Sequence, residues 1–545
     1  MCSGGTRQTV LSLLAALALP VLAAGCNAIL PYGSRDSSTD RSTRDGQRDA
    51  GLADRRGIPE GAHDGARPDV PRDGAAPDRR QDLAAADSAA DRASADQTPS
   101  PDLQPPDKPP PAPDGGGVLA HQWSRRFGAQ YPDSAYAAGV DAQGNVYVAG
   151  AFVGTVDFGG GPLISTANSS DIFLASYTPS GAHRFSRRVG STWGDWAGAM
   201  AVDASGNSYL TGLFSETVDF GGGSVVSVGA GDVFLASYDA DGKYRFALPL
   251  GKCQYNEEGR AIALAPSGDI WITGYFWGPS SFGGGSLTSA GGADIFVAGF
   301  SSSGAHLFSQ RFGGANEDSG EAIAVDGLGN VHVVGYVNSA VDFGGGLRPH
   351  KGKADVFLLS LSSTGQHRFS HQLGGAADDK ALAVAADALG DSYFTGFFSS
   401  SASFGGATFS AGQQDAFLAS YGANGTHRFS KQMGGTQGDA GRAIALRPGG
   451  GGLLAGMYNA KATFEGVSLT SSGGDDIFLA SFDGLGALGP VSSIGGAGTE
   501  VVWSVVPASG GAVYLAGNFT GTTNLAGQTH TSVGQTDAFL LKLGP

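Results

Sequence analysis

Apolar and polar residues alternate along most of this chain, with the period of two that is typical of β-strands. In the stretch at 232–251, DVFLASYDADGKYRFALPLG, alternate positions such as Phe234, Ala236 and Tyr238 are apolar. An Asp-Gly turn signal interrupts the run, and a second alternating run follows it. The pattern predicts two antiparallel strands joined by a tight turn.

The Asp-x-Phe signal that opens this stretch recurs along the chain at steps of 61, 62, 61, 60, 61 and 61 residues. Its aspartates are Asp171, Asp232, Asp294, Asp355, Asp415, Asp476 and Asp537. A fixed period of this length indicates one supersecondary unit repeated seven times. Each unit contains four predicted strands, A to D, which in the copy that begins at Gly190 span 197–203, 207–214, 232–238 and 244–250. The connection from B to C is long, and the A–B and C–D turns are tight.

The two ends of the repeat region favour a closed ring over an open solenoid. The region opens with a D strand at 121–127 and closes with a C strand at 537–543. The last repeat therefore lacks a D strand, and the first D strand lacks strands A, B and C. An open array would leave unpaired edges and would call for caps. We therefore predict an all-β, seven-bladed β-propeller over residues 118–545, with four-stranded antiparallel blades and a ring closed by pairing of the N-terminal D strand with the C-terminal A–C strands. Seven glycines near the end of strand B give the same count: Gly150, Gly212, Gly274, Gly335, Gly396, Gly456 and Gly517.

Residues 1–25 have the features of an export signal, with Arg7 ahead of a short apolar run at 10–24. The Ala-Ala-Gly-Cys sequence that ends at Cys26 resembles the lipobox of bacterial lipoproteins. That resemblance implies a lipidated Cys26, whose acyl chains would anchor the protein to a membrane. The alternative is an ordinary cleaved signal followed by an incidental cysteine. In either case Cys253 stands alone in the mature repeat region, so no internal disulfide is expected and its role is open.

Residues 26–117 form the predicted tether, which is rich in Asp, Arg, Ala and Pro. Their apolar content is too low and too unpatterned to bury a core, so we expect a disordered linker. Across the whole chain the net charge is -16, which argues against nucleic acid as a partner because phosphates would be repelled.

The repeat itself resembles a known family. The segments GGANEDSGEAIAVDGLGNVHVVGY (313–336) and ADVFLLSLSSTGQHRFSHQLGG (354–375) are similar to the bacterial beta-propeller repeat, or SBBP repeat, and the resemblance covers about 118–545. It implies a secreted or surface protein, and it implies no common enzymatic activity.

A polar residue, in most copies an acid, follows the glycine of each D strand at a spacing of five residues. These residues are Asp133, Asp195, Asn256, Asp318, Asp379, Asp439 and Glu500. One hypothesis is turn chemistry, in which each side chain accepts backbone N–H groups. The other is an electronegative channel mouth that holds a cation such as Ca²⁺. No other cofactor is expected. The Asp-x-Phe aspartates and the histidines that open the D strands are interpreted as turn and edge residues.

Aromatic residues break the sevenfold pattern on three adjacent D–A loops. Tyr131, Trp193, Trp196 and Tyr255 lie there with Glu257 close by. They predict an aromatic shelf that stacks on sugar rings or holds a protein partner, and the alternative is packing over neighbouring loops.

The preferred functional hypothesis is a lipid-anchored, monomeric envelope protein at the outer membrane or cell surface. Its D–A and B–C loop face would bind protein or glycan or act as a scaffold. The alternative is an enzyme, a lyase or glycosidase, that acts on polysaccharide with carboxylates at the channel mouth. The sequence contains no recognisable catalytic motif to support the second hypothesis.

Overall fold

The computed structural model describes residues 119–447 and 450–545. The predicted signal peptide at 1–25, the lipidation site Cys26 and the tether at 26–117 lie outside the described residues. Regular structure in the described part is β apart from two short 3₁₀ turns, η1 (Thr166–Asn168) and η2 (Ser509–Gly511). A search of the same residues finds no helix with the length and apolarity that a membrane span requires.

The strands form four-stranded antiparallel meanders that follow the sequence repeat. The first three consist of β2 (Ser134–Val140), β3 (Val146–Val153), β6 (Ser170–Tyr177) and β7 (His183–Val189); β8 (Trp196–Val202), β9 (Ser208–Phe214), β12 (Asp232–Tyr238) and β13 (Tyr244–Leu250); and β14 (Glu258–Leu264), β15 (Ile270–Phe276), β18 (Asp294–Phe300) and β19 (His306–Phe312).

Three further meanders are joined edge to edge, because β25 also pairs with β27 and β29 also pairs with β31. They consist of β20 (Ser319–Val325), β21 (Val331–Val337), β24 (Asp355–Leu361) and β25 (His367–Gly375); β26 (Asp379–Ala386), β27 (Ser392–Ser403), β28 (Thr408–Tyr421) and β29 (His427–Gly435); and β30 (Ala440–Leu446), β31 (Gly452–Phe464), β32 (Val467–Phe482) and β33 (Leu488–Ile494).

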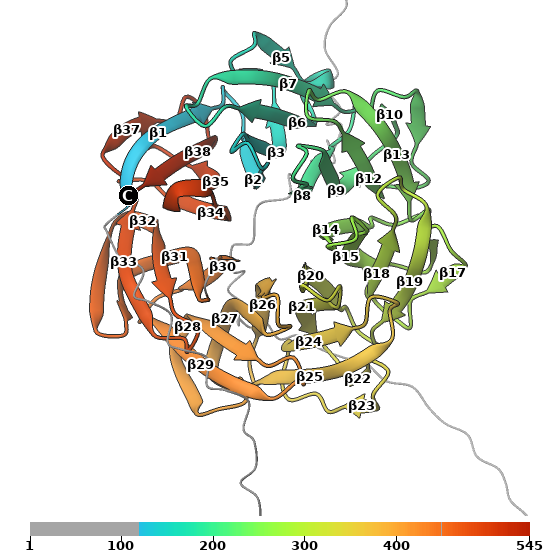
Figure 1. Ribbon diagram of the computed structural model, residues 1–545, viewed down its shortest axis with the longest axis vertical. Coiled ribbons are helices and arrows are strands. Elements are labelled where there is room, and N and C mark those ends of the chain that lie inside the picture. Colours follow the sequence, from blue (N-terminus) through green and yellow to red (C-terminus); the bar gives the residue numbers. More distant parts are fainter. Residues whose placement is uncertain (1–118, 448–449) are drawn as a thin grey trace, which may run out of the picture. The chain divides into compact units, whose positions relative to one another are not determined.

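The last sheet combines the two ends of the described region. It contains β34 (Glu500–Pro507), β35 (Val513–Phe519), β38 (Asp537–Gly544) and β1 (Ala120–Phe127). β1 pairs antiparallel with β38, with Phe127 opposite Ala538 and Ser124 opposite Leu541. Figure 1 shows the pair as a blue strand beside a red one. The first and the last strand of the described region therefore lie side by side in one sheet.

The first strands of successive meanders contact one another in sequence. β2 contacts β8, β8 contacts β14, and the series continues through β20, β26, β30 and β34, which in turn contacts β2. Figure 1 shows these seven strands around a common centre.

Part of each long B–C connection forms a short hairpin of its own in most repeats. The hairpins pair β4 (Thr155–Asp157) with β5 (Pro162–Ile164), β10 (Thr217–Asp219) with β11 (Ser224–Val226), β16 (Pro279–Ser281) with β17 (Ser286–Thr288), β22 (Val341–Asp342) with β23 (Leu347–Arg348), and β36 (Thr522–Leu525) with β37 (Gln528–Thr531). In the remaining two repeats β27 and β28, and likewise β31 and β32, are long enough to include it.

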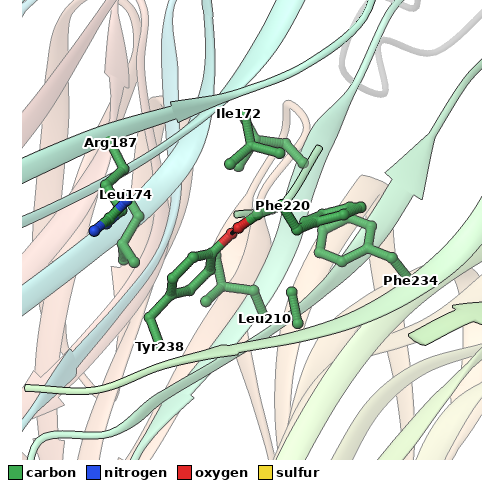
Figure 2. Close-up of a pocket in the computed structure, with 9 residues that line it drawn as sticks. Ile172, Leu174, Arg187, Leu210, Phe220, Phe234 and Tyr238 are labelled. Atoms are coloured by element: carbon green, nitrogen blue, oxygen red, sulfur yellow. Dashed lines mark hydrogen bonds between the residues drawn. The ribbon is translucent and has the colours of Figure 1, made fainter. Parts of the chain in front are cut away.

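A phenylalanine from this connection fills the space between neighbouring sheets. Figure 2 shows one such interior, in which Ile172 and Leu174 of β6 lie near Leu210 of β9 and Phe220. The hydroxyl of Tyr238 donates a hydrogen bond to the carbonyl oxygen of Phe220 at 3.0 Å. The remaining cavity is about 10 Å³, too small for any ligand larger than water. Packing thus explains the phenylalanine of the Val-Asp-Phe-Gly-Gly-Gly sequence at 218–223.

Each A strand carries a β-bulge, at the point where strand B has its glycine. In β14 the register shifts between Gly259 and Ala261, and Gly274 of β15 pairs with Gly259. A Cβ at Gly274 would overlap the carbonyl oxygen of Glu258. The bulge thus explains why strand B keeps a glycine here.

Candidate functional site

The predicted acids of the D–A loops are buried and bind backbone. The carboxylate of Asp195 accepts the N–H of Ser191 at 2.6 Å and the N–H of Ser215 at 2.7 Å. Asp133, Asp318, Asp379 and Asp439 make the same two bonds, four residues before and twenty residues after the aspartate. Each of these carboxylates ties a D–A loop to a backbone N–H of strand B or of the residue that follows it, as the turn-chemistry hypothesis expects.

The third repeat differs from the sequence prediction. Asn256 is exposed, whereas Glu257 is fully buried and accepts the N–H of Cys253 at 3.4 Å. Glu257 therefore belongs to the ring of buried acids and lies beneath the surface where the aromatic shelf was predicted. We call the following set the acid ring: Asp133, Asp195, Glu257, Asp318, Asp379, Asp439 and Glu500.

An Asp-x-Phe aspartate lies close to each acid of the ring. A Cβ on Gly434 would lie 2.7 Å from Asp415 Oδ1 and 2.8 Å from Asp439 Oδ2, so only a glycine separates the two carboxyl groups. The charge of Asp415 accordingly contributes to a higher pKa at Asp439, after the larger effect of burial. Across residues 119–447 and 450–545, no three His, Cys, Asp or Glu side chains are grouped so that they could hold a metal ion.

Burial raises the pKa of Asp195 to about 7, although its two backbone hydrogen bonds lower it. The pKa reaches about 7 for the same leading reason at Asp133, Glu257, Asp379, Asp439 and Glu500, and about 6 at Asp318. In the unfolded chain the pKa of these carboxyl groups is about 4. At pH values between the unfolded and the folded pKa, the folded state therefore binds more protons than the unfolded state.

From this we predict that the free energy of unfolding falls as the pH rises from about 5 to about 8, because the stabilisation is complete below the unfolded pKa and is lost through the folded pKa. The melting temperature, measured in buffers of equal ionic strength, should be several degrees lower at pH 8 than at pH 5. Asp195→Asn, which removes one titrating group, should reduce this dependence. A melting temperature that rises steadily over the same range would contradict the prediction.

Three of the four predicted shelf residues are exposed on the loops. The exposed fractions are 38% for Tyr131, 60% for Trp193 and 51% for Tyr255. The fourth, Trp196, is half-buried, and its indole N–H donates to Glu258 Oε1 at 2.9 Å. Trp196 therefore belongs to a different group of side chains, described below.

The sequence prediction missed an aromatic partner of Tyr255. The ring centroid of Trp277 lies 6.0 Å from that of Tyr255. The two residues line an open cavity of about 740 Å³ together with Asn256, Gly278, Ser289, Ala290 and Gly291, and we call it the loop pocket. Its volume is that of a site for a small ligand.

Cys253 lies beneath this pocket and is a free thiol with 5% exposure. Its Sγ accepts the N–H of Tyr255 at 3.3 Å. Burial raises the pKa of the thiol, which suppresses the reactive thiolate. A packing role below the loop is consistent with this environment.

A second set of side chains gathers where the bulges redirect them. In each A strand the register shift leaves one residue without a partner in strand B. These bulge residues are Tyr136, Gly198, Arg260, Glu321, Leu382, Arg442 and Trp503. Their identities differ from repeat to repeat, although the small and apolar residues around them recur.

Contacts within and between repeats join several of these residues to neighbouring side chains. Arg260 Nη2 lies 3.3 Å from Glu258 Oε2, and the guanidinium of Arg442 lies 4.9 Å from the ring centroid of Trp503. Tyr136 packs edge-on against Trp503 at 5.8 Å. We call the following set the central cluster: Tyr136, Trp196, Glu258, Arg260, Tyr275, Glu321, Tyr336, Lys380, Arg442 and Trp503.

Repeated four-stranded antiparallel meanders, whose first strands contact one another in sequence, define a β-propeller fold. The family model described as beta-propeller repeat, SBBP, matches residues 307–341, which span β19 to the start of β22. The match supports the resemblance drawn from the repeat motifs.

Among curated proteins, the regulatory protein FlaEY of Caulobacter vibrioides is 28% identical over 200 residues. The aligned part is 34% of this chain and 20% of FlaEY, so the chain spans about a fifth of that relative.

Similar solved structures include Sqt1 from Chaetomium thermophilum, at 14% identity and a TM-score of 0.41, over 78% of this chain and all of that one (100%). YCF48 bound to D1 peptide matches at 9% identity and 0.39, over 80% and 97% of the two chains. An ulvan lyase of polysaccharide lyase family PL25 matches at 12% identity and 0.40, over 72% and 93%. These likenesses concern the fold only.

Proposed function

We propose that residues 118–545 form a closed seven-bladed β-propeller that serves as a binding or scaffold module for glycan or protein, most plainly at the loop pocket. The pairing of β1 with β38 and the contact of β34 with β2 support the closed ring. The loop pocket carries the functional part of the proposal, because it is an open cavity lined by residues of one repeat. No other repeat has an aromatic residue at the position of Trp277.

The binding proposal predicts that ligands depend on the two rings of the loop pocket. A panel of envelope polysaccharide fragments and peptides, screened against the full-length protein in detergent, should yield a ligand whose affinity falls at least about tenfold in Trp277→Ala and in Tyr255→Ala, since one decade corresponds to about 1.4 kcal/mol of lost stacking and burial. Leu307→Ala is the matched control, because Leu307 is 55% exposed in the same repeat but lies on the D strand β19. Unchanged affinity in both Trp277→Ala and Tyr255→Ala would show that the loop pocket is not the binding site.

Lipid anchoring at the outer membrane or cell surface, as a monomer, is the second part of the proposal. The Ala-Ala-Gly-Cys motif at Cys26 supports it, and residues 26–117 would serve as the tether. Cys26→Ser should move the protein from the membrane fraction to the soluble fraction, because the acyl chains supply the anchor. Ala24→Ser, which keeps the cysteine, serves as the control. A Cys26→Ser protein that stays with the membrane would argue for another mode of attachment.

We do not propose catalysis by the acid ring. A general acid or base must reach the substrate. The carboxylates of the ring are buried, and those of Asp133, Asp195, Asp318, Asp379 and Asp439 each hold two backbone N–H groups.

A further inference from the structure

The central cluster departs from the repeat more strongly than any surface loop. The small residues that flank each bulge recur, but the bulge residue itself is an aromatic, a glycine, a leucine, a carboxylate or an arginine. Bulges commonly redirect side chains beside functional sites. Positions at which the residue type departs from a repeat pattern are also those at which a functional site is expected.

Electrostatic coupling shows that side chains of non-adjacent repeats share this region. The pKa of Tyr136 in β2 is raised, mainly by burial, and the charges of Glu258 and Arg260 in β14 also act on it. Burial alone would lower the pKa of Arg260, but Glu258 and then Glu321 raise it overall. The side chain of Arg260 still keeps 36% of its accessible surface, so solvent reaches this cation.

The charges of the cluster are mixed, with a cationic excess. Three cations, Arg260, Lys380 and Arg442, stand against the carboxylates of Glu258 and Glu321. The cluster is therefore net positive by one charge, in a chain whose net charge is -16. Such a site attracts an anion that is small enough to reach the inner strands.

Aromatic faces accompany two of the cations. Lys380 Nζ lies 3.7 Å from the ring centroid of Tyr336, and Arg442 lies over Trp503. Trp503 is fixed by its N–H, which donates to Asn518 Oδ1 at 2.7 Å. The rings of Tyr336 and Trp503 thus offer apolar faces next to positive charge. Both rings are half-buried and accessible to solvent.

We propose that the central cluster binds an acidic sugar residue, one that carries a carboxylate or a sulfate. The anionic group would accept hydrogen bonds from Arg442 and Lys380, and the C–H face of the ring would stack on Trp503 or Trp196. The sugar hydroxyls would donate to Glu321. An acidic peptide carries few hydroxyl donors and would place its carboxylates against Glu321 without compensation. The inference rests on the proposed binding role and assigns it a ligand class at a second site beside the loop pocket.

Titration of the full-length protein in detergent with trigalacturonate and with its fully methyl-esterified form tests the inference. Trigalacturonate should bind with a Kd of about 1 mM or tighter, and the neutral ester at least about tenfold more weakly, because a charge-assisted bond is lost. A sulfated galactose disaccharide distinguishes sulfate from carboxylate as the preferred group.

Arg442→Met and Lys380→Met should each weaken trigalacturonate binding about tenfold. Two variants are used so that the test still stands if one of them fails to fold. Lys353→Met is the matched control, because Lys353 is a loop cation with 74% side-chain exposure. Equal affinity for the acid and its ester, absence of binding to either anionic sugar, or a preference for triglutamate would overturn the inference. A neutral sugar that binds through Trp277 without preference for charge would overturn it while leaving the proposed function intact.

Discussion

Gly274→Ala is expected to destabilise the protein by about 3 kcal/mol or more, as overpacking against rigid backbone does. The added Cβ would overlap the carbonyl oxygen of Glu258, which the bulge of β14 holds against β15. A carbonyl in a paired strand cannot rotate away as the end of a side chain can. The substitution should therefore disturb the bulge and lower both the melting temperature and the soluble yield.

Gly285→Ala is the control for this prediction. Gly285 lies in the same repeat, a Cβ there meets nothing within 4 Å, and its φ lies outside the left-handed region. Its melting temperature should stay within about a degree of wild type, since surface changes usually cost under about 0.5 kcal/mol. If the two variants melt together, the bulge does not have the geometry described here.

Much of the fold followed from the repeat, because strand periodicity and turn glycines are local signals. The order of residues alone revealed the period of about 61 residues, the four strands of each unit and the D-strand character of residues 121–127. The B–C hairpins were not predicted, since strands of three residues such as β4 and β10 give no measurable alternation.

The acid ring was predicted in six repeats and missed in one for a specific reason. The loop after Gly251 contains one more residue than the others, and Lys252 absorbs it with a φ of 97°. Counting forward from the glycine therefore reached Asn256, whereas counting 61 residues back from Asp318 reaches Glu257.

The central cluster could not be predicted because a bulge shifts the alternation by one residue. Side chains after the shift change faces, and simple alternation then assigns Arg260 and Arg442 to the wrong side of the strand. A signal was present nonetheless. In six of the seven repeats an alanine or glycine precedes the bulge position and an alanine follows it, whereas the residue between them is Tyr, Gly, Arg, Glu, Leu or Arg.

In the closed ring proposed above, β1 would complete the last sheet by pairing with β38. Phe127 of β1 is buried, and Trp123 packs on Tyr514 with 5.7 Å between ring centroids. A chain that starts at residue 129 should lose these contacts and expose the edge of β38. Burial of one large aromatic is worth about 3 to 5 kcal/mol, so the loss should exceed that of any single substitution above.

The most direct measurement compares the thermal unfolding of chains 119–545 and 129–545, with and without a synthetic peptide of residues 119–128. We expect the longer chain to unfold cooperatively, and the shorter chain to aggregate or melt at least about 10 °C lower. Addition of the peptide should restore part of the difference. If both chains melt at the same temperature and the peptide has no effect, β1 does not close the ring.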